Sequence, residues 1–235
     1  MKVTGGLKAV QPHEPNLKKT CDLRRMISGA TRYQEGDSID TYLGQRGLTA
    51  RPNQNVWLHP GMIHPETHKK HKVICDLWYM PNGEVAAFHR TYLDEYGCKL
   101  EGVKQNKLMS PKTVKSLSGG ACRLMDIGEE AAMCIGEGKE SALACSQFMG
   151  GMPAWACTTS NLLEKFQLPE RIADQVDHFV IPIDADRKFA GQKSSFELAR
   201  RLRVNYGKTV NLIMPDKLGC DCLDIVNGAC GMYWI

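Results

Sequence analysis

From Glu130 onward, apolar strand-like runs alternate with helix-like segments, and this alternation most constrains what the chain can fold into. The strand-like runs, such as "AAMCI" and "FVIPI", are continuously apolar. Strands of this kind are buried on both faces, which is typical of a parallel sheet covered by helices. The predicted strands are 131–137, 153–159, 178–186 and 209–215, and the predicted helices are 138–150, 160–168 and 190–207. The sequence therefore predicts an α/β domain over residues 126–235.

The first half of the chain has a different pattern, in which two short helices precede a β-hairpin. Residues 20–28 and 37–47 have helical patterns, and 72–94 contains two β runs joined by Pro81-Asn82-Gly83, a strong turn signal. The Lys-rich stretch 101–123 is predicted as a loop. We therefore expect a smaller basic α+β subdomain over residues 1–125, with the boundary near 126–130.

Charge is distributed unevenly between these two parts. Residues 1–125 contain 19 Lys and Arg against 11 Asp and Glu, a balance of +8. Residues 126–235 contain 11 against 15, a balance of −4. A basic part suits polyanions and an acidic part suits metal cations, although two solubilising surfaces of opposite sign would give the same totals.

The composition argues against membrane, secreted and zinc-finger classes. No apolar run approaches the ~20 residues that cross a bilayer, and the first residues have no signal-peptide core, so we expect a cytoplasmic protein without a membrane partner. The ten cysteines form no C-x-x-C pair and are interpreted as reduced core thiols. His59, His64, His68 and His71 have some zinc-ligand spacings, but neighbouring prolines and lysines make zinc unfavourable.

Acidic residues follow three of the predicted strands. Glu137 lies between two glycines after the first, Asp184 and Asp186 end the third, and Asp221 and Asp224 follow the last. The carboxyl ends of parallel strands meet at one edge of a sheet, where ligands bind. Carboxylates gathered there repel one another unless a cation lies between them, and an oxygen-only ligand set favours Mg²⁺ or Mn²⁺. Each signal alone is weak, because a single D-x-D is more often a surface turn, but together they predict metal-assisted phosphoryl transfer.

Two segments carry a family resemblance. "CIGEGKESALA" and "IPIDADRKFAGQKSSFELARRL" resemble the Toprim domain of bacterial-type primases, topoisomerases and some nucleases, and look most like phage and plasmid primases. The resemblance implies that Glu137, Asp184 and Asp186, with Asp221 and Asp224, bind Mg²⁺. It also implies that Glu137 acts as an acid or base.

The first half is similar to the basic subdomain that precedes Toprim in primases, in "GEVAAFHRTYLDEYGCKLEG" and "NKLMSPKTVKSLSGGACRL". The resemblance implies that Arg90, Lys107, Lys112 and Arg123 contact template or nucleotide. The alternative for each of them is a solvated basic face. Trp57, Trp78 and Tyr92 could stack on bases, but core packing is the simpler interpretation.

The implied activity is synthesis of short primers on a single-stranded DNA template from nucleoside triphosphates, a DNA-directed RNA polymerase reaction. The zinc-binding and helicase modules of bacterial-type primases are not evident, so we expect a catalytic core that works with a separate helicase or zinc-domain protein. Two alternatives stay open: a Toprim nuclease, and a nucleic-acid-binding module without catalysis. A topoisomerase is disfavoured because the chain is too short for a strand-passage gate.

Overall fold

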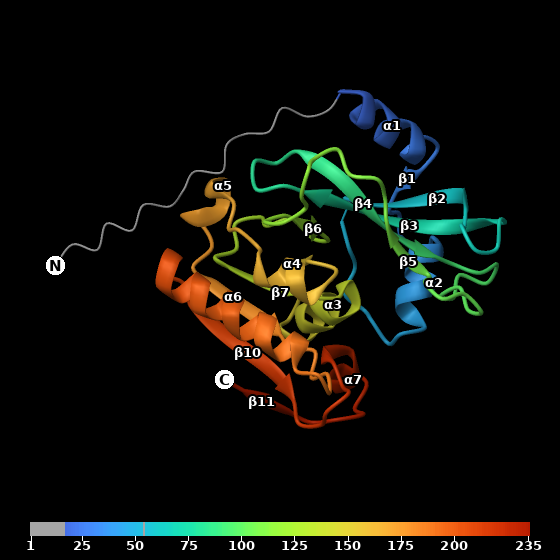
Figure 1. Ribbon diagram of the computed structural model, residues 1–235. Helices are drawn as coiled ribbons and strands as arrows, with labels where there is room; N and C mark the ends of the chain where they lie inside the picture. The colour runs from blue at the N-terminus through green and yellow to red at the C-terminus, as the bar shows by residue number, and fades with distance from the viewer. Residues whose placement is uncertain (1–16, 54) are drawn as a thin grey trace.

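The computed structural model describes residues 17–53 and 55–235 and contains one mixed sheet that runs through the molecule (Figure 1). Its strands are β1 (Thr31–Arg32), β2 (Val56–Ile63), β3 (Lys70–Tyr79), β4 (Val85–Tyr92), β5 (Lys107–Met109), β6 (Ala121–Arg123), β7 (Ala132–Gly136), β8 (Ala154–Ala156), β9 (His178–Pro182), β10 (Thr209–Pro215) and β11 (Met232–Trp234). The helices are α1 (Leu17–Ile27), α2 (Ser38–Gly44), α3 (Lys139–Phe148), α4 (Ser160–Glu164), α5 (Glu170–Ala173), α6 (Ala190–Tyr206) and α7 (Cys222–Val226).

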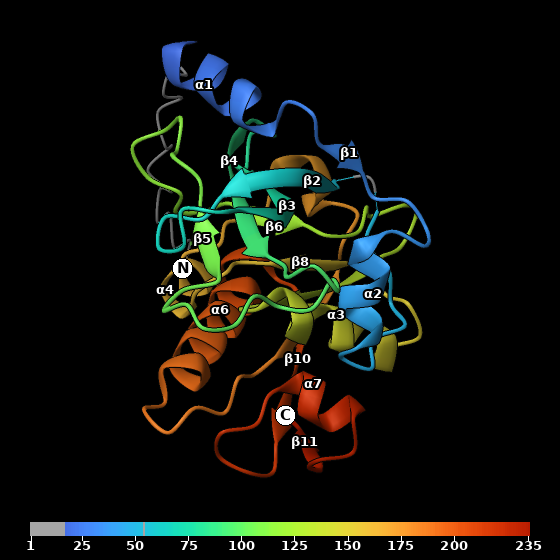
Figure 2. The ribbon, with the colours of Figure 1, turned by 90° about the vertical axis from the view of Figure 1, so that its right-hand side faces the viewer.

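The second half has the predicted α/β arrangement. Strands β8, β7, β9 and β10 lie side by side in that order and are parallel, and β11 adds an antiparallel edge. Helices α4 and α6 lie on one side of these strands, and α3 and α7 lie on the other (Figure 2). The prediction of a parallel sheet flanked by helices is therefore confirmed, including the end of α6 at Gly207, which has a φ of 67°.

The first half is an antiparallel meander with helices beside it. The hairpin predicted over 72–94 is present as β3 and β4, but the prediction of a loop over 101–123 was wrong, because β5 and β6 lie within it. Strand β2 was not predicted either. It contains Pro60 and Gly61, and its pairing with β3 shifts between His59 and Met62, an irregularity that accommodates a residue without an N–H.

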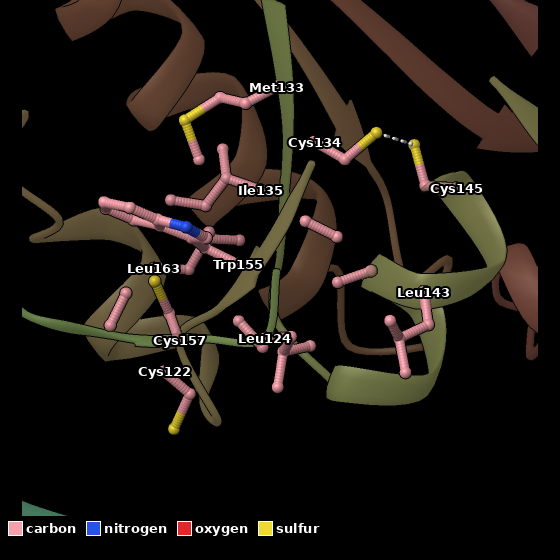
Figure 3. Packing of buried hydrophobic residues seen from close by; sticks show 14 of the residues in the cluster. Cys122, Leu124, Met133, Cys134, Ile135, Leu143, Cys145, Trp155, Cys157 and Leu163 are labelled. Atoms are coloured by element: carbon pink, nitrogen blue, oxygen red, sulfur yellow. Dashed lines mark hydrogen bonds between the residues drawn. The ribbon is translucent and has the colours of Figure 1, made fainter. Parts of the chain in front are cut away.

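Strand β6 connects the two halves into one sheet. Its residue Cys122 pairs with Trp78 of β3 on one side and with Ala156 of β8 on the other, antiparallel in both cases. The main hydrophobic core is likewise shared, because it contains Tyr42 from the first half and Phe179 from the second. Figure 3 shows part of this core around Trp155 and its neighbours. The two halves of the chain differ in charge, but in the folded protein they share one sheet and one hydrophobic core.

The cysteines contribute mainly to this interior. All ten are free thiols, and seven of them are buried. Between β7 and α3, Sγ of Cys145 donates a hydrogen bond to Sγ of Cys134 at 3.2 Å, and the two thiols form no disulfide (Figure 3). Across the described residues, the helices are all too short or too polar to cross a membrane.

Candidate active site at the carboxyl edge of the sheet

The predicted acids lie where the parallel strands end. Glu137 follows β7 directly, and Asp184 lies two residues beyond β9, the neighbouring strand. Asp221 follows β10 as the N-cap of α7. The chain leaves β7 toward β8 on one side, while β9 lies on its other side, so these acids flank a topological switch point, where open α/β sheets bind ligands.

Asp184 is the central acid of this edge. Its side chain is largely buried, and Ser141 of α3 donates a hydrogen bond to Oδ1 at 2.9 Å. Burial, followed by the nearby charges of Glu137 and Asp221, raises the pKa of Asp184 to about 7. Low solvation is therefore the main cause of the shift, and the neighbouring carboxylates add to it.

Glu137 and Asp221 show the same effect. Burial raises the pKa of Glu137, with a contribution from the charge of Asp186. Burial also raises the pKa of Asp221 above its ordinary value. The structure therefore brings Glu137, Asp184 and Asp221 within electrostatic reach of one another, with Asp186 beside them.

Asp186 and Asp224 also have local structural roles. Asp186 accepts backbone N–H bonds from Lys188 at 2.7 Å and from Gly191 at 2.6 Å, which hold its pKa below the ordinary value. Asp224 forms a reciprocal capping box with Asp221, in which each side chain accepts the other's backbone N–H. Sequence spacing had not distinguished these roles from metal ligation.

A divalent metal fits this edge by the chemistry of its donors. In the described part of the chain, no three His, Cys, Asp or Glu side chains are grouped tightly enough to hold an ion by themselves. Mg²⁺ nevertheless binds through one or two carboxylates and completes its shell with water and substrate phosphates. Burial and the charges of Glu137 and Asp221 disfavour the ionised form of Asp184, and a divalent cation bound there would offset both effects.

Gly191 fixes the position of Asp184. It lies in the first turn of α6, where a Cβ atom would be 2.3 Å from the backbone oxygen of Asp184. Because that oxygen belongs to the backbone, a side chain at 191 must displace the loop that carries the acids.

We expect Gly191→Ala to lower the free energy of unfolding by about 1–3 kcal/mol. The matched control is Gly44→Ala, since Gly44 ends α2 and a Cβ atom there would meet nothing within 4 Å. Urea denaturation of both variants measures the difference. Equal stability of the two variants would contradict the steric argument.

Glu140 is the site residue that sequence analysis missed. It lies in the first turn of α3, where an acid is common at the surface, but Glu140 is only 5 % exposed. It accepts hydrogen bonds from the hydroxyl of Tyr42 and from Nζ of Lys107, the latter at 2.7 Å. Burial opposes its ionisation, but Lys107 and Lys139 outweigh burial and hold the pKa of Glu140 far below the ordinary value.

A second buried ion pair lies beside it. Nζ of Lys139 lies 3.0 Å from Oδ2 of Asp76 on β3, and both side chains are almost fully buried. Nδ1 of His89 on β4 lies 3.4 Å from the same oxygen. Together these contacts fasten the start of α3, two residues after Glu137, to the antiparallel strands. The only sequence signal was a Lys-Glu pair at the head of an otherwise small and apolar helix.

The predicted basic residues differ in how exposed their side chains are. Lys107 is one-third exposed beside Glu140, and Lys112 is exposed. Arg90 is partly buried and donates to the hydroxyl of Tyr92 at 2.9 Å and to the carbonyl of Met109 at 3.2 Å.

The resemblance implied that Arg123 contacts template or nucleotide. In the structure, however, Arg123 is only 6 % exposed and packs in the interior. Its guanidinium lies over the rings of Tyr79 and Trp155, 4.5 Å and 5.0 Å from their centroids. Burial lowers its pKa to about 10. A cation enclosed in this way stabilises the packing around β6, between β3 and β8, and is not exposed for contact with a template.

The remaining aromatic and histidine candidates are largely structural. Trp78 and Tyr92 are fully buried, while Trp57 is partly exposed with Arg32 over its ring. His64 is buried between the backbone carbonyl of Gln105 and the backbone N–H of Glu66, so both of its ring nitrogens already have partners.

Comparison with known proteins agrees with this architecture. The profile of the Toprim domain family matches residues 132–229, and a family described as a domain of unknown function (DUF7146) matches residues 18–124. None of the curated proteins compared with the sequence matches it.

Several solved primase structures are similar to the chain. The primase fragment of the bacteriophage T7 primase-helicase protein has a TM-score of 0.50 at 14% identity, over 86% of this chain and 76% of that chain. A DNA primase domain from Pseudomonas aeruginosa has a TM-score of 0.47 at 17% identity, over 91% and 74%. The E. coli primase catalytic core also has a TM-score of 0.47, at 16% identity, over 91% and 75%.

The profile match includes β7, β9 and β10 and every predicted acid from Glu137 to Asp224. The likeness to the T7 fragment extends through the antiparallel strands as well and concerns the fold. Residues 132–229 therefore match the Toprim domain family, and the mixed α/β fold of the chain is similar to that of the T7 primase fragment.

Proposed function

We propose that this protein is the catalytic core of a primase, which joins nucleotides into short primers on a single-stranded DNA template. The observation that carries the proposal is the convergence of Glu137, Asp184 and Asp221 at the switch point of a Toprim domain, reflected in the raised pKa of Asp184. In this proposal residues 1–125 bind template and nucleotide, and residues 126–235 hold the acids.

Asp184, Asp186 and Asp221 would hold Mg²⁺ or Mn²⁺, with Glu137 or Asp224 completing the set. Bound there, the ion would neutralise charge on the triphosphate during phosphoryl transfer. Asp186 is already fixed by backbone N–H groups, so its carboxylate is held in one orientation without substrate.

Glu137 suits the role of proton acceptor. Burial and the charge of Asp186 raise the pKa of its carboxyl, which strengthens it as a base toward the 3′-hydroxyl of a primer. It lies directly after β7, with its backbone carbonyl bonded to the N–H of Thr158 at 2.7 Å, so its main chain is fixed. The carboxylate would take the hydroxyl proton as that oxygen bonds to the α-phosphorus, while the bond from this phosphorus to the bridging oxygen breaks and pyrophosphate leaves.

Lys107 suits contact with the triphosphate. Its ammonium is held at 2.7 Å by Glu140, and the charge of Glu140 in turn acts on Asp184, so this cation belongs to the same edge as the acids. Two of its three N–H donors remain for phosphate oxygens after the bond to Glu140. Arg90 and the exposed Lys112 would contact the template backbone.

The decisive experiment incubates the purified chain with single-stranded DNA, Mg²⁺ or Mn²⁺, and labelled ribonucleotides or deoxyribonucleotides. We expect new short oligomers that disappear with EDTA and with Glu137→Gln. A shortened template would instead identify a Toprim nuclease, and binding without either product would identify a non-catalytic module. Repeating the assay with a replicative helicase or a separate zinc-domain protein tests the proposed partners.

A further inference from the structure

The outward face of α6 combines aromatic and basic side chains in one stripe that begins beside the acids. The exposed residues at helical spacing are Phe189, Lys193, Phe196, Arg200 and Arg203, preceded by exposed Arg187 and Lys188. Positions 193, 196, 200 and 203 follow steps of three and four residues and so share one face, and Phe189 is the N-cap residue that precedes the helix. The opposite face, with Leu198 and Leu202, is buried on the sheet.

Phe189 is exposed in a way that packing does not explain. It is 58 % exposed and has a φ of 60°, a left-handed conformation that is unfavourable for a residue with a Cβ atom. Its backbone N–H donates to the carbonyl of Asp186 at 3.1 Å, and its carbonyl accepts from Lys193 at 3.0 Å. The turn closed by Asp186 thus leaves an aromatic side chain exposed three residues after this acid.

The cations of the stripe are available to an anionic ligand. Lys193 pairs with Glu164 at 3.1 Å through a single surface contact, and such contacts are weak. Arg200 donates two bonds to Glu197, at 2.9 Å and 2.7 Å, but its side chain is 60 % exposed and has further N–H donors for a phosphate. Arg201, one position further along, contrasts with them because it turns inward and donates to the carbonyls of Glu164 and Phe166. The outward residues have no comparable anchoring in the interior.

We infer that a single-stranded nucleic acid runs along the outer face of α6, with bases stacked on Phe189 and Phe196 and phosphates paired with the surrounding cations. Alternating aromatic and basic groups match a chain that alternates bases and phosphates, and a single strand leaves its bases free to stack. The 17 residues of α6 span about 25 Å, so this track leads several nucleotides to the acids. The inference rests on the proposed function for its choice of ligand and adds a template path outside the basic first half.

The test measures binding of a fluorescent oligothymidylate of about 20 nucleotides to the full chain by anisotropy, without metal or nucleotides. Phe189→Ala is expected to weaken binding about tenfold, while Phe189→Trp retains it because a ring remains for stacking. Arg200→Ala/Arg203→Ala is expected to reduce the slope of log affinity against log salt by about 0.7 for each lost phosphate contact.

The matched control is Arg171→Ala/Lys217→Ala, which removes the same charge from exposed positions outside both α6 and the basic first half. If the α6 variants bind no worse than this control, the track is overturned, whatever the activity of the chain. If Phe189→Ala binds weakly and Phe189→Trp normally, the track stands, even where the unaltered protein makes no primers and the proposed polymerase activity fails. Circular dichroism spectra that match the unaltered protein ensure that binding, and not folding, is compared.

Discussion

Asp184→Asn is expected to abolish primer synthesis while making the metal-free protein more stable. The substitution removes a carboxylate from the centre of the acidic edge, so we expect a loss of about a thousandfold in activity. It also removes a buried charge next to Glu137 and Asp221, which oppose its ionisation. An acid that serves only the fold would show the opposite pattern, with stability and activity lost together.

The stability gain depends on pH. Asp184 has a folded pKa of about 7 against an ordinary value of 3.8, so between these values the folded state holds a proton that the unfolded state has released. Stability therefore falls as pH rises from about 4 to 7 and is constant above, by at most about 4 kcal/mol from this group. Asp184→Asn should show little of this decline.

Thermal unfolding in EDTA at pH 5 and pH 8 measures both effects. The difference in stability between variant and unaltered protein should be small at pH 5 and large at pH 8. Saturating Mg²⁺ at pH 8 should stabilise the unaltered protein more than Asp184→Asn, because the bound ion would offset the repulsion between Asp184 and the neighbouring carboxylates. A variant less stable than the unaltered protein at pH 8 without metal would overturn the electrostatic interpretation of this edge.

Asp76→Ala is expected to be the most damaging single substitution for stability. It leaves the ammonium of Lys139 buried without its carboxylate, which costs about 3–5 kcal/mol for pairs of this kind. The hydrogen bond from His89 is lost with it. Because Asp76 is on β3 and Lys139 begins α3, the loss falls on the contact between the two halves of the protein.

The double variant Asp76→Ala/Lys139→Met provides the control. Removing both charges leaves no unpaired ion, so we expect chemical denaturation to recover most of the lost stability. If the double variant is as unstable as the sum of the single ones, the two residues do not act as a pair. The single variant Lys139→Met separates loss of the amine from loss of the carboxylate.

The buried contacts of Lys139 and Glu140 also hold the segment that carries Glu137. Glu137 is followed by Gly138, and then by Lys139 and Glu140, whose side chains point into contacts with the first half of the chain. The strand that carries Glu137 is thereby tied to β3 through Asp76 and to β5 through Lys107. Assembly of the proposed active site therefore depends on contacts between both halves.

Much of the fold was predictable from the sequence because its signals are local. Continuously apolar runs identified β7, β9 and β10, and Pro81-Asn82-Gly83 identified the hairpin of β3 and β4. Strand β6 was missed because three residues give no readable period, and β2 was missed because Pro60 and Gly61 interrupt its pattern. The convergence of Glu137, Asp184 and Asp221 follows from parallel strands having their carboxyl ends at one edge.

What the sequence by itself determined is therefore the order of strands and helices and the positions of the acids, since these follow from residue type and spacing along the chain. Only the tertiary structure decided which charged residues are buried and paired. Tyr42 and Glu140 are 98 residues apart, and Asp76 and Lys139 are 63 apart. The burial of Arg123 at β6 is of the same kind. The partners of such groups are chosen by packing between distant segments, and no local pattern records that choice.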